Sequence, residues 1–251
     1  MPAPTFSRIE SVAVRSLRWI MAALVLVSLA AHPAQAEGLQ GARILVMSKT
    51  AGFRHASIPA GQGALLEIAR EEGFTVTFTE DAAQFTDERL GQYDAVVFLN
   101  TTGDMLDQAQ QASFERYVAA GRGLLGIHAA TDTETDGGWP WYNALIGAKF
   151  KSHPAIQEAR LIPSAPGASE FRFTDEWYDF ADASPSRRAL VEIDRGSYEG
   201  SGATGREPIV WTNEVAGARA FYIGLGHTDE SYASPVMRAF IVQGLRYAVG
   251  D

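Results

Sequence analysis

The stretch Gly121-Arg-Gly-Leu-Leu-Gly-Ile-His-Ala-Ala-Thr-Asp132 decides the fold of this chain. Leu124, Leu125 and Ile127 form a short apolar run between glycines, which is typical of a strand buried on both faces. His128 follows at once, and the next residues become polar. Because ligands bind just beyond the carboxyl ends of strands in an open parallel sheet, we expect His128 to face a site.

The segments on either side of this strand alternate between strands and helices. Apolar runs at 43–47, 74–78 and 94–99 predict three more strands. A helix with Ser57 as its N-cap and a second helix over 107–121 separate them. This order predicts an α/β fold with a mainly parallel central sheet and helices on both faces.

After Gly147 the pattern changes. The runs 156–162, 171–173, 189–193 and 208–212 predict strands without intervening helices, and we expect them to form an antiparallel extension of the same domain. A further strand over 218–225 and a helix over 235–249 complete the chain. Since no long linker is present, residues 37–251 are predicted to form a single domain.

Residues 1–36 have the features of a secretory signal peptide. Arg8, Arg15 and Arg18 precede an apolar run over 19–31, and Ala34-Gln-Ala36 is a small-x-small cleavage signature. The alternative, an uncleaved anchor helix, is disfavoured because the run is shorter than the ~20 residues that span a bilayer. We therefore expect an exported protein, periplasmic or extracellular, with no stable membrane anchor after cleavage.

Charge and composition exclude several functions. Removing residues 1–36 removes three Arg and one Glu from the totals of 21 basic and 30 acidic residues, which leaves 18 and 29 and a net charge of −11. Such a surface argues against nucleic acid as a partner. The chain has no cysteine, so disulfides and a thiol nucleophile are excluded. The Gly61-Gln-Gly63 segment matches no phosphate loop or dinucleotide motif, which disfavours a nucleotide cofactor.

Four histidines remain after residue 36, and each follows an apolar run: His55, His128, His153 and His227. If these runs are parallel strands of one sheet, the histidines meet at one edge. A convergent group indicates proton transfer or a bound cation, and all four are candidate ligands of a divalent metal, although no spacing matches a compact zinc motif. The alternative is that each histidine independently caps a loop.

Other side chains near these loops are candidates for catalysis and binding. Glu176 precedes Trp177 and Tyr178, and apolar neighbours would raise its pKa and suit it to general acid catalysis. Aromatic rings suit the apolar face of a sugar, and cationic side chains suit a carboxylate, a phosphate or a polarised carbonyl. The predicted binding residues are Lys49, Phe53, Arg54, Trp139, Tyr142, Lys151, His153, Tyr178, Asp229 and Glu230.

Several ordered motifs together resemble those of the ThuA-like, trehalose utilisation family. They are Gly52-Phe-Arg-His55, Gly126-Ile-His-Ala-Ala130, the block from Trp139 to Pro154, Asp175-Glu176 with Tyr178, Pro208 with Trp211, and Leu225-Gly-His-Thr228. The resemblance implies a flavodoxin-like fold similar to class I glutamine amidotransferases. His128 stands where those enzymes hold their cysteine, so amidotransferase chemistry does not carry over.

Three hypotheses follow for the function. In the first, His128 moves a proton at a sugar carbonyl or glycosidic oxygen, assisted by His55 or His227 and with Glu176 as second acid or base, so that the protein processes a disaccharide or keto-sugar. The second is a carbohydrate-binding protein without turnover. The third is a metal-dependent sugar hydrolase or isomerase. A homo-oligomer is compatible with each.

Overall fold

The computed structural model describes residues 38–134 and 138–251, and the predicted signal peptide lies outside these ranges. The described residues all belong to one compact unit. Within the described ranges, no helix combines the length and the apolar character needed to cross a bilayer.

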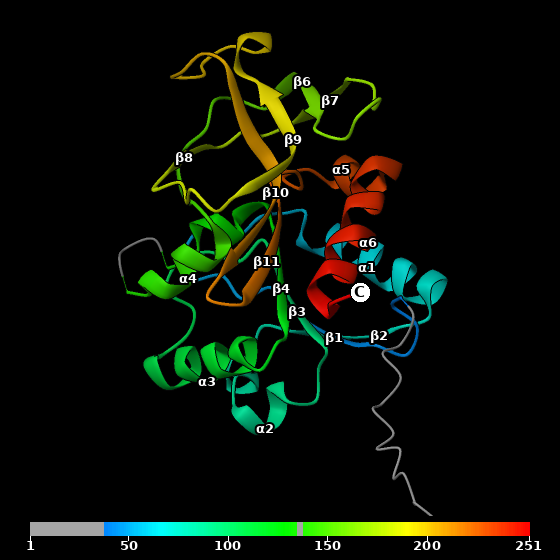
Figure 1. Ribbon diagram of the computed structural model, residues 1–251, viewed down its shortest axis with the longest axis vertical. Coiled ribbons are helices and arrows are strands. Elements are labelled where there is room, and N and C mark those ends of the chain that lie inside the picture. The colour runs from blue at the N-terminus through cyan, green and yellow to red at the C-terminus, as the bar shows by residue number, and fades with distance from the viewer. Residues whose placement is uncertain (1–37, 135–137) are drawn as a thin grey trace, which may run out of the picture. The chain divides into compact units, whose positions relative to one another are not determined.

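Nine strands form one mixed sheet (Figure 1). Its parallel half has the order β2-β1-β3-β4-β11 and its antiparallel half continues with β10-β9-β6-β7. The parallel strands are β1 (Arg43–Met47), β2 (Thr75–Thr79), β3 (Ala95–Leu99), β4 (Gly123–Ile127) and β11 (Ala218–Ile223). The antiparallel strands are β6 (Gln157–Pro163), β7 (Phe171–Asp175), β9 (Arg188–Asp194) and β10 (Arg206–Val215).

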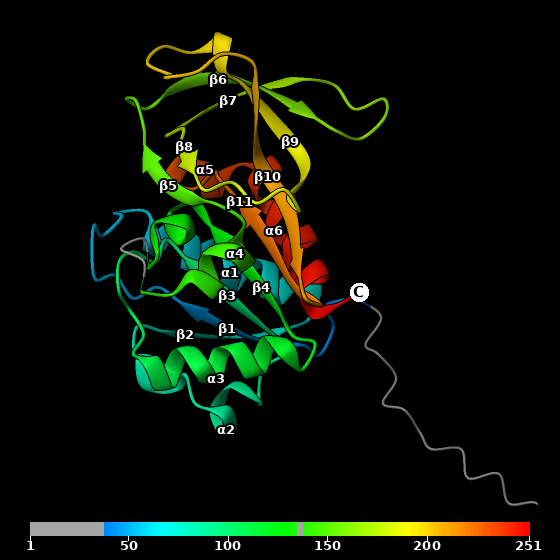
Figure 2. The same cartoon turned by 60° about the vertical axis from the view of Figure 1, so that its left-hand side comes forward.

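Helices cover both faces of the parallel half (Figure 2). Alternate residues of each strand point to opposite faces, so Ile44 and Val46 pack in one core and Leu45 and Met47 in another. The first core includes residues of α1 (Ile58–Glu72) and α6 (Pro235–Val249); the second includes residues of α2 (Asp87–Leu90), α3 (Gln108–Ala119) and α4 (Pro140–Ile146). A short helix, α5 (Asp229–Ala233), precedes α6.

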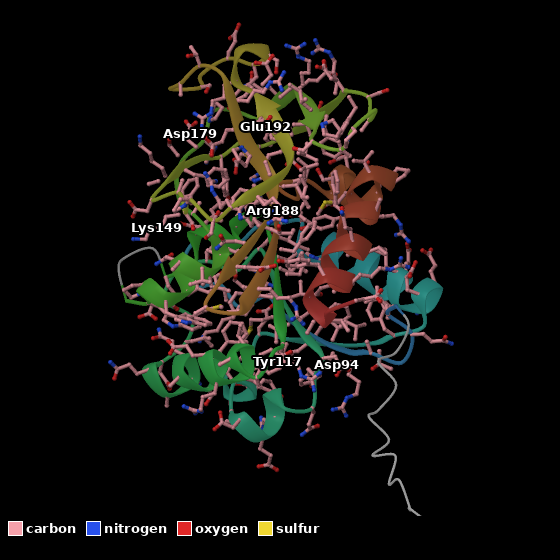
Figure 3. All side chains as sticks on the ribbon, in the orientation of Figure 1. Asp94, Tyr117, Lys149, Asp179, Arg188 and Glu192 are labelled. Atoms are coloured by element: carbon pink, nitrogen blue, oxygen red, sulfur yellow. The ribbon has the colours of Figure 1, made fainter. Side chains whose placement is uncertain are left out.

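A two-stranded sheet of β5 (Lys149–Ser152) and β8 (Asp179–Ala181) accompanies the antiparallel half. In Figure 3 the labels of Lys149, Asp179 and Glu192 mark strands of the small sheet and of the antiparallel half. Asp94 and Tyr117 are labelled lower in the same view. This small sheet places the loops around His153 and Tyr178 next to each other.

The predicted fold class, a mainly parallel sheet with an antiparallel extension, is confirmed. Ser57 is the N-cap residue of α1, as predicted, but its side chain does not cap the helix. Its hydroxyl donates instead to the Gly226 carbonyl at 2.9 Å. That bond ties the start of α1 to the loop after β11.

Candidate functional site

Three loops bring three histidines together at the carboxyl edge of the parallel strands. His55 follows β1, His128 follows β4 directly, and His227 follows β11. The ring centroid of His55 lies 4.9 Å from that of His128 and 5.0 Å from that of His227, and the last two are 5.3 Å apart. These residues are distant in sequence and share one site because their strands run parallel.

His128 is fully buried and is held in one orientation. Its backbone adopts φ 48°, an unfavourable value for a residue with a Cβ, at the sharp turn out of β4. The Tyr222 hydroxyl donates to its carbonyl at 2.7 Å. Its Nδ1 lies 3.1 Å from the Gly224 carbonyl, which can only accept, so Nδ1 carries the proton and Nε2 of the neutral ring is an acceptor.

Glu176 lies between the histidines. Its Oε2 is 3.0 Å from Nδ1 of His227 and 3.5 Å from Nε2 of His128, and its Oε1 is 2.9 Å from Nδ1 of His153. Burial alone would raise the pKa of Glu176, but the hydrogen bonds and the positive charge that His128 and His227 supply when they are protonated outweigh it and lower this pKa to about 2. The expectation of a raised pKa for Glu176 is therefore wrong, and the side chain is a carboxylate.

The pKa of His227 shifts in the opposite direction to that of Glu176. Its hydrogen bond to Glu176 is the main cause of a raised pKa, which burial partly opposes. The side chain is 22% exposed, and that of His153 is 41% exposed, whereas Glu176 is only 7% exposed. The cluster thus opens to solvent through His227 and His153.

His55 is buried, and its Nδ1 has no hydrogen-bond partner among the described residues. Burial is the main cause that lowers the pKa of His55 to about 3, and the neighbouring His128 and His227 add to it. The ring is therefore neutral. Phe53 packs edge-on against it with centroids 4.9 Å apart and remains 65% exposed, which places an apolar ring at the rim of the site.

Tyr178 closes another side of the site. Its ring centroid lies 4.4 Å from that of His128 and 4.4 Å from that of Phe150. The side chain is buried, which raises the pKa of its hydroxyl well above the usual value. Tyr178 thus contributes a neutral wall beside the imidazole of His128.

Asp175 fixes the loop that carries His227, a role that sequence reasoning missed. Its buried carboxylate accepts hydrogen bonds from the backbone N–H groups of Gly226 and His227, at 2.8 and 3.1 Å. It also accepts from the Ser231 hydroxyl at 2.7 Å and from the Glu176 N–H at 2.8 Å. Two adjacent acids were the available signal, but nothing in the local sequence shows that both are buried or that Asp175 bonds the loop while Glu176 faces the histidines.

Asn100 also holds this loop and was not predicted. Its amide donates to the Gly226 carbonyl and to the Ser57 hydroxyl, each at 3.1 Å. Gly226 has φ 124°, a conformation that favours glycine. The loops after β1, β3 and β11 are therefore joined beneath the histidines.

Several predicted binding residues lie elsewhere. Trp139 and Tyr142 are buried in the core against Phe114 and Phe98 respectively, so neither ring presents a face to a ligand. The prediction that Trp139 and Tyr142 contact a sugar is therefore wrong. Arg54 forms an exposed ion pair with Glu80, with 2.7 Å between its Nη2 and the Glu80 Oε1.

The other charged candidates contact no residue of the cluster in the described part of the chain. Lys49 donates to the Met105 carbonyl at 2.7 Å and lines a separate cleft of about 510 Å³. Lys151 is exposed on β5. Asp229 and Glu230 are exposed in the first turn of α5, where acidic side chains favour the helix N-terminus.

The arrangement can support two kinds of chemistry. It holds an ionised carboxylate, a histidine with an available acceptor nitrogen and a histidine that shares a proton with the carboxylate, which suits proton transfer. One potential ligand atom from each of His55, His128, Glu176 and His227 also lies within 4.8 Å of the others, so these four could hold a metal ion. His153 is not in that group, since it contacts the other oxygen of Glu176.

Comparison with solved structures shows the fold. A putative ThuA-like protein from Bacteroides uniformis is 22% identical with a TM-score of 0.71, over 85% of this chain and 93% of that one. A second from Parabacteroides merdae is 21% identical with a TM-score of 0.69, over 84% and 91%. A β-galactosidase from Bacillus circulans sp. alkalophilus is 12% identical with a TM-score of 0.54, over 85% of this chain but only 31% of that one.

No curated protein sequence matches the chain. The family model described as ThuA, trehalose utilisation, matches residues 43–248, which include every strand and all three clustered histidines. His128 lies at the turn directly after β4. The chain therefore belongs to the ThuA, trehalose utilisation family, and this membership supports a role related to carbohydrates.

Proposed function

We propose that this protein is an exported enzyme that processes a disaccharide or its keto derivative by proton transfer at His128, His227 and Glu176. The observation that carries the proposal is the position of the Glu176 carboxylate between the imidazoles of His128 and His227. Family membership supplies the substrate class.

The hydrogen bonds assign complementary roles to the two histidines. The proton on Nδ1 of His128 is held by the Gly224 carbonyl, which leaves Nε2 as a base. Nδ1 of His227 lies 3.3 Å from that Nε2 and bonds the Glu176 carboxylate, which favours its protonated form. With the two groups this close, His128 can take a proton from one oxygen or carbon of the sugar, and His227 can give a proton to a neighbouring atom.

The walls of the site suit a sugar. Phe53 offers an exposed ring at the rim that can contact the C–H face of a pyranose, and the buried ring of Tyr178 supports His128 from the side. His153 is exposed and bonds Oε1 of Glu176, which places it where a bound sugar hydroxyl could reach it.

Incubation of the purified protein with disaccharides and their keto derivatives, followed by NMR, tests the proposal. We expect conversion of at least one sugar, and we expect Glu176→Gln to lower kcat by about 10² to 10⁴. Glu80→Gln is the matched control, because Glu80 lies in an exposed ion pair with Arg54. Tight binding of a sugar without conversion would instead support a binding protein, and equal rates for the Glu176→Gln variant and the wild type would exclude the proposed role of Glu176.

A further inference from the structure

We infer that the cluster of His55, His128, His227 and Glu176 is a binding site for a divalent transition metal ion, with Zn²⁺ as the best fit. The inference rests on the proposed function only for the catalytic role of the ion. A bound ion would occupy Nε2 of His128 and Nδ1 of His227 in place of the shared proton, and would act there instead of direct proton transfer between these two nitrogens. Ion binding itself can be measured without any sugar.

The distances between the potential ligand atoms match a tetrahedral ion. Zinc bonds histidine nitrogen and carboxylate oxygen at about 2.0–2.2 Å, so two ligands of a tetrahedral site lie about 3.3–3.5 Å apart. Here Nε2 of His128 lies 3.3 Å from Nδ1 of His227 and 3.5 Å from Oε2 of Glu176, and the last two atoms are 3.0 Å apart. These three atoms form one face of such a tetrahedron.

The protonation pattern also fits an ion. In its neutral form His128 presents the lone pair of Nε2 to the cluster, because its Nδ1 proton points at the Gly224 carbonyl. A histidine that binds a metal usually donates its second N–H to a carbonyl or carboxylate in this way. Glu176 is fixed in the same manner, since its second oxygen contacts His153 at 2.9 Å.

His55 provides the independent observation. It is 4% exposed and its Nδ1 lacks a hydrogen-bond partner among the described residues, which is costly for a buried polar atom. One of its ring nitrogens lies within 4.8 Å of the other three ligand atoms. As a fourth ligand beside the other three atoms, this buried neutral imidazole would gain the partner that it lacks.

Imidazole and carboxylate together select the ion. Three imidazoles, of which His227 must release its Nδ1 proton to bind, and one carboxylate suit zinc and its first-row neighbours more than Mg²⁺ or Ca²⁺, which prefer oxygen ligands. The set carries one negative charge, so a bound divalent ion keeps a net positive charge and could polarise a sugar oxygen. His153 is outside this set of four ligands. It is exposed and bonds Oε1 of Glu176, so its imidazole would lie next to the ion without binding it.

Titration of the chelator-treated protein with ZnCl₂ alone tests the inference by calorimetry and by metal analysis after gel filtration. We expect one zinc per chain. His128→Ala, His227→Ala and Glu176→Gln should each weaken binding at least about 100-fold, and His55→Ala about 10-fold because its nitrogen is the most distant. Arg54→Ala and Glu80→Gln, which alter an exposed ion pair at the same edge of the sheet, should change the dissociation constant less than about threefold.

A second measurement guards against variants that fail to fold. The wild-type protein loaded with Co²⁺ should show the intense visible absorption of a tetrahedral site, and circular dichroism should show that each variant is folded. Absence of stoichiometric zinc binding by the wild type, or unchanged affinity in all four ligand variants, would overturn the inference. Zinc binding without sugar conversion would refute only the proposed function, whereas conversion that is insensitive to chelator would refute only the role of the ion.

Discussion

Replacing Asp175 with asparagine should destabilise the folded protein by about 3 kcal/mol, because a buried carboxylate that accepts four hydrogen bonds becomes an amide. Oδ1 accepts from the N–H groups of Glu176 and His227, and Oδ2 accepts from the Gly226 N–H and the Ser231 hydroxyl. The charged acceptor therefore holds three backbone donors in two loops.

The magnitude follows from the best orientation that the amide can adopt. If its NH₂ replaces Oδ2, the Ser231 hydroxyl can turn and accept, but the Gly226 N–H then faces another donor and is left unsatisfied. The unsatisfied N–H costs about 1–3 kcal/mol. The remaining hydrogen bonds also become weaker, because a hydrogen bond to a charged group contributes about 1.5–3 kcal/mol and one to a neutral group about 1 kcal/mol. The opposite orientation leaves two backbone donors unsatisfied and is worse.

Urea unfolding at pH 7, followed by circular dichroism, measures this difference. The matched control is Asp182→Asn, since Asp182 is 69% exposed and pairs with Lys149 at the surface, and it should lose less than about 0.5 kcal/mol. A loss below about 1 kcal/mol for Asp175→Asn would refute the argument that this carboxylate holds the loop of His227.

Three further substitutions test other parts of the fold. Gly126→Ala should destabilise by about 1–3 kcal/mol in urea unfolding, because a Cβ there would lie 2.5 Å from Cδ1 of Ile146; a neutral result would show that α4 can shift. Tyr222→Phe should cost about 1–2 kcal/mol and increase the temperature dependence of the His128 NMR signals, since the buried His128 carbonyl loses the closer of its two hydroxyl donors and keeps only Thr131 at 3.4 Å; unchanged stability would contradict this. Burial is the main cause of the raised pKa of Glu134. The folded protein therefore holds the proton of the Glu134 carboxyl more tightly than the unfolded chain does, and stability is lost as the pH rises through and above the ordinary glutamate pKa. Glu134→Gln should therefore gain stability relative to wild type between about pH 4 and pH 7, and a constant difference across that range would refute it.

The parallel half of the fold could be predicted because its strands are short apolar runs that end in polar loops. Such runs are buried on both faces, and the bounds expected for β1, β3 and β4 differ from the structure by one residue at most. The short elements α4, α5, β5 and β8 were not predicted, since each is too brief for periodicity to identify.

The three clustered histidines could be predicted because the parallel sheet itself places them, whereas Glu176 was predicted from its aromatic neighbours and not from strand order. His55, His128 and His227 follow strands that share an edge, so their position follows from strand order. The aromatic candidates follow no such rule. Trp139, Tyr142 and Tyr178 are all aromatic residues near the histidine loops in the sequence. The first two pack in the core, and of the three only Tyr178 contacts His128. Tertiary packing, which the local sequence does not show, decides which ring faces the site.

Glu176 shows why the antiparallel extension matters for function. Three strands separate β7 from β11 in the sheet, yet the residues that end β7 hydrogen-bond the loop that follows β11. The extension therefore supplies the one carboxylate among the four clustered side chains, while the parallel half supplies the three imidazoles. Because Asp175 clamps the His227 loop and Glu176 bonds the His227 ring, the extension both completes the chemistry and sets its geometry. A site divided in this way exists only when both halves of the sheet are folded, so the stability of the extension and the affinity of the site should change together.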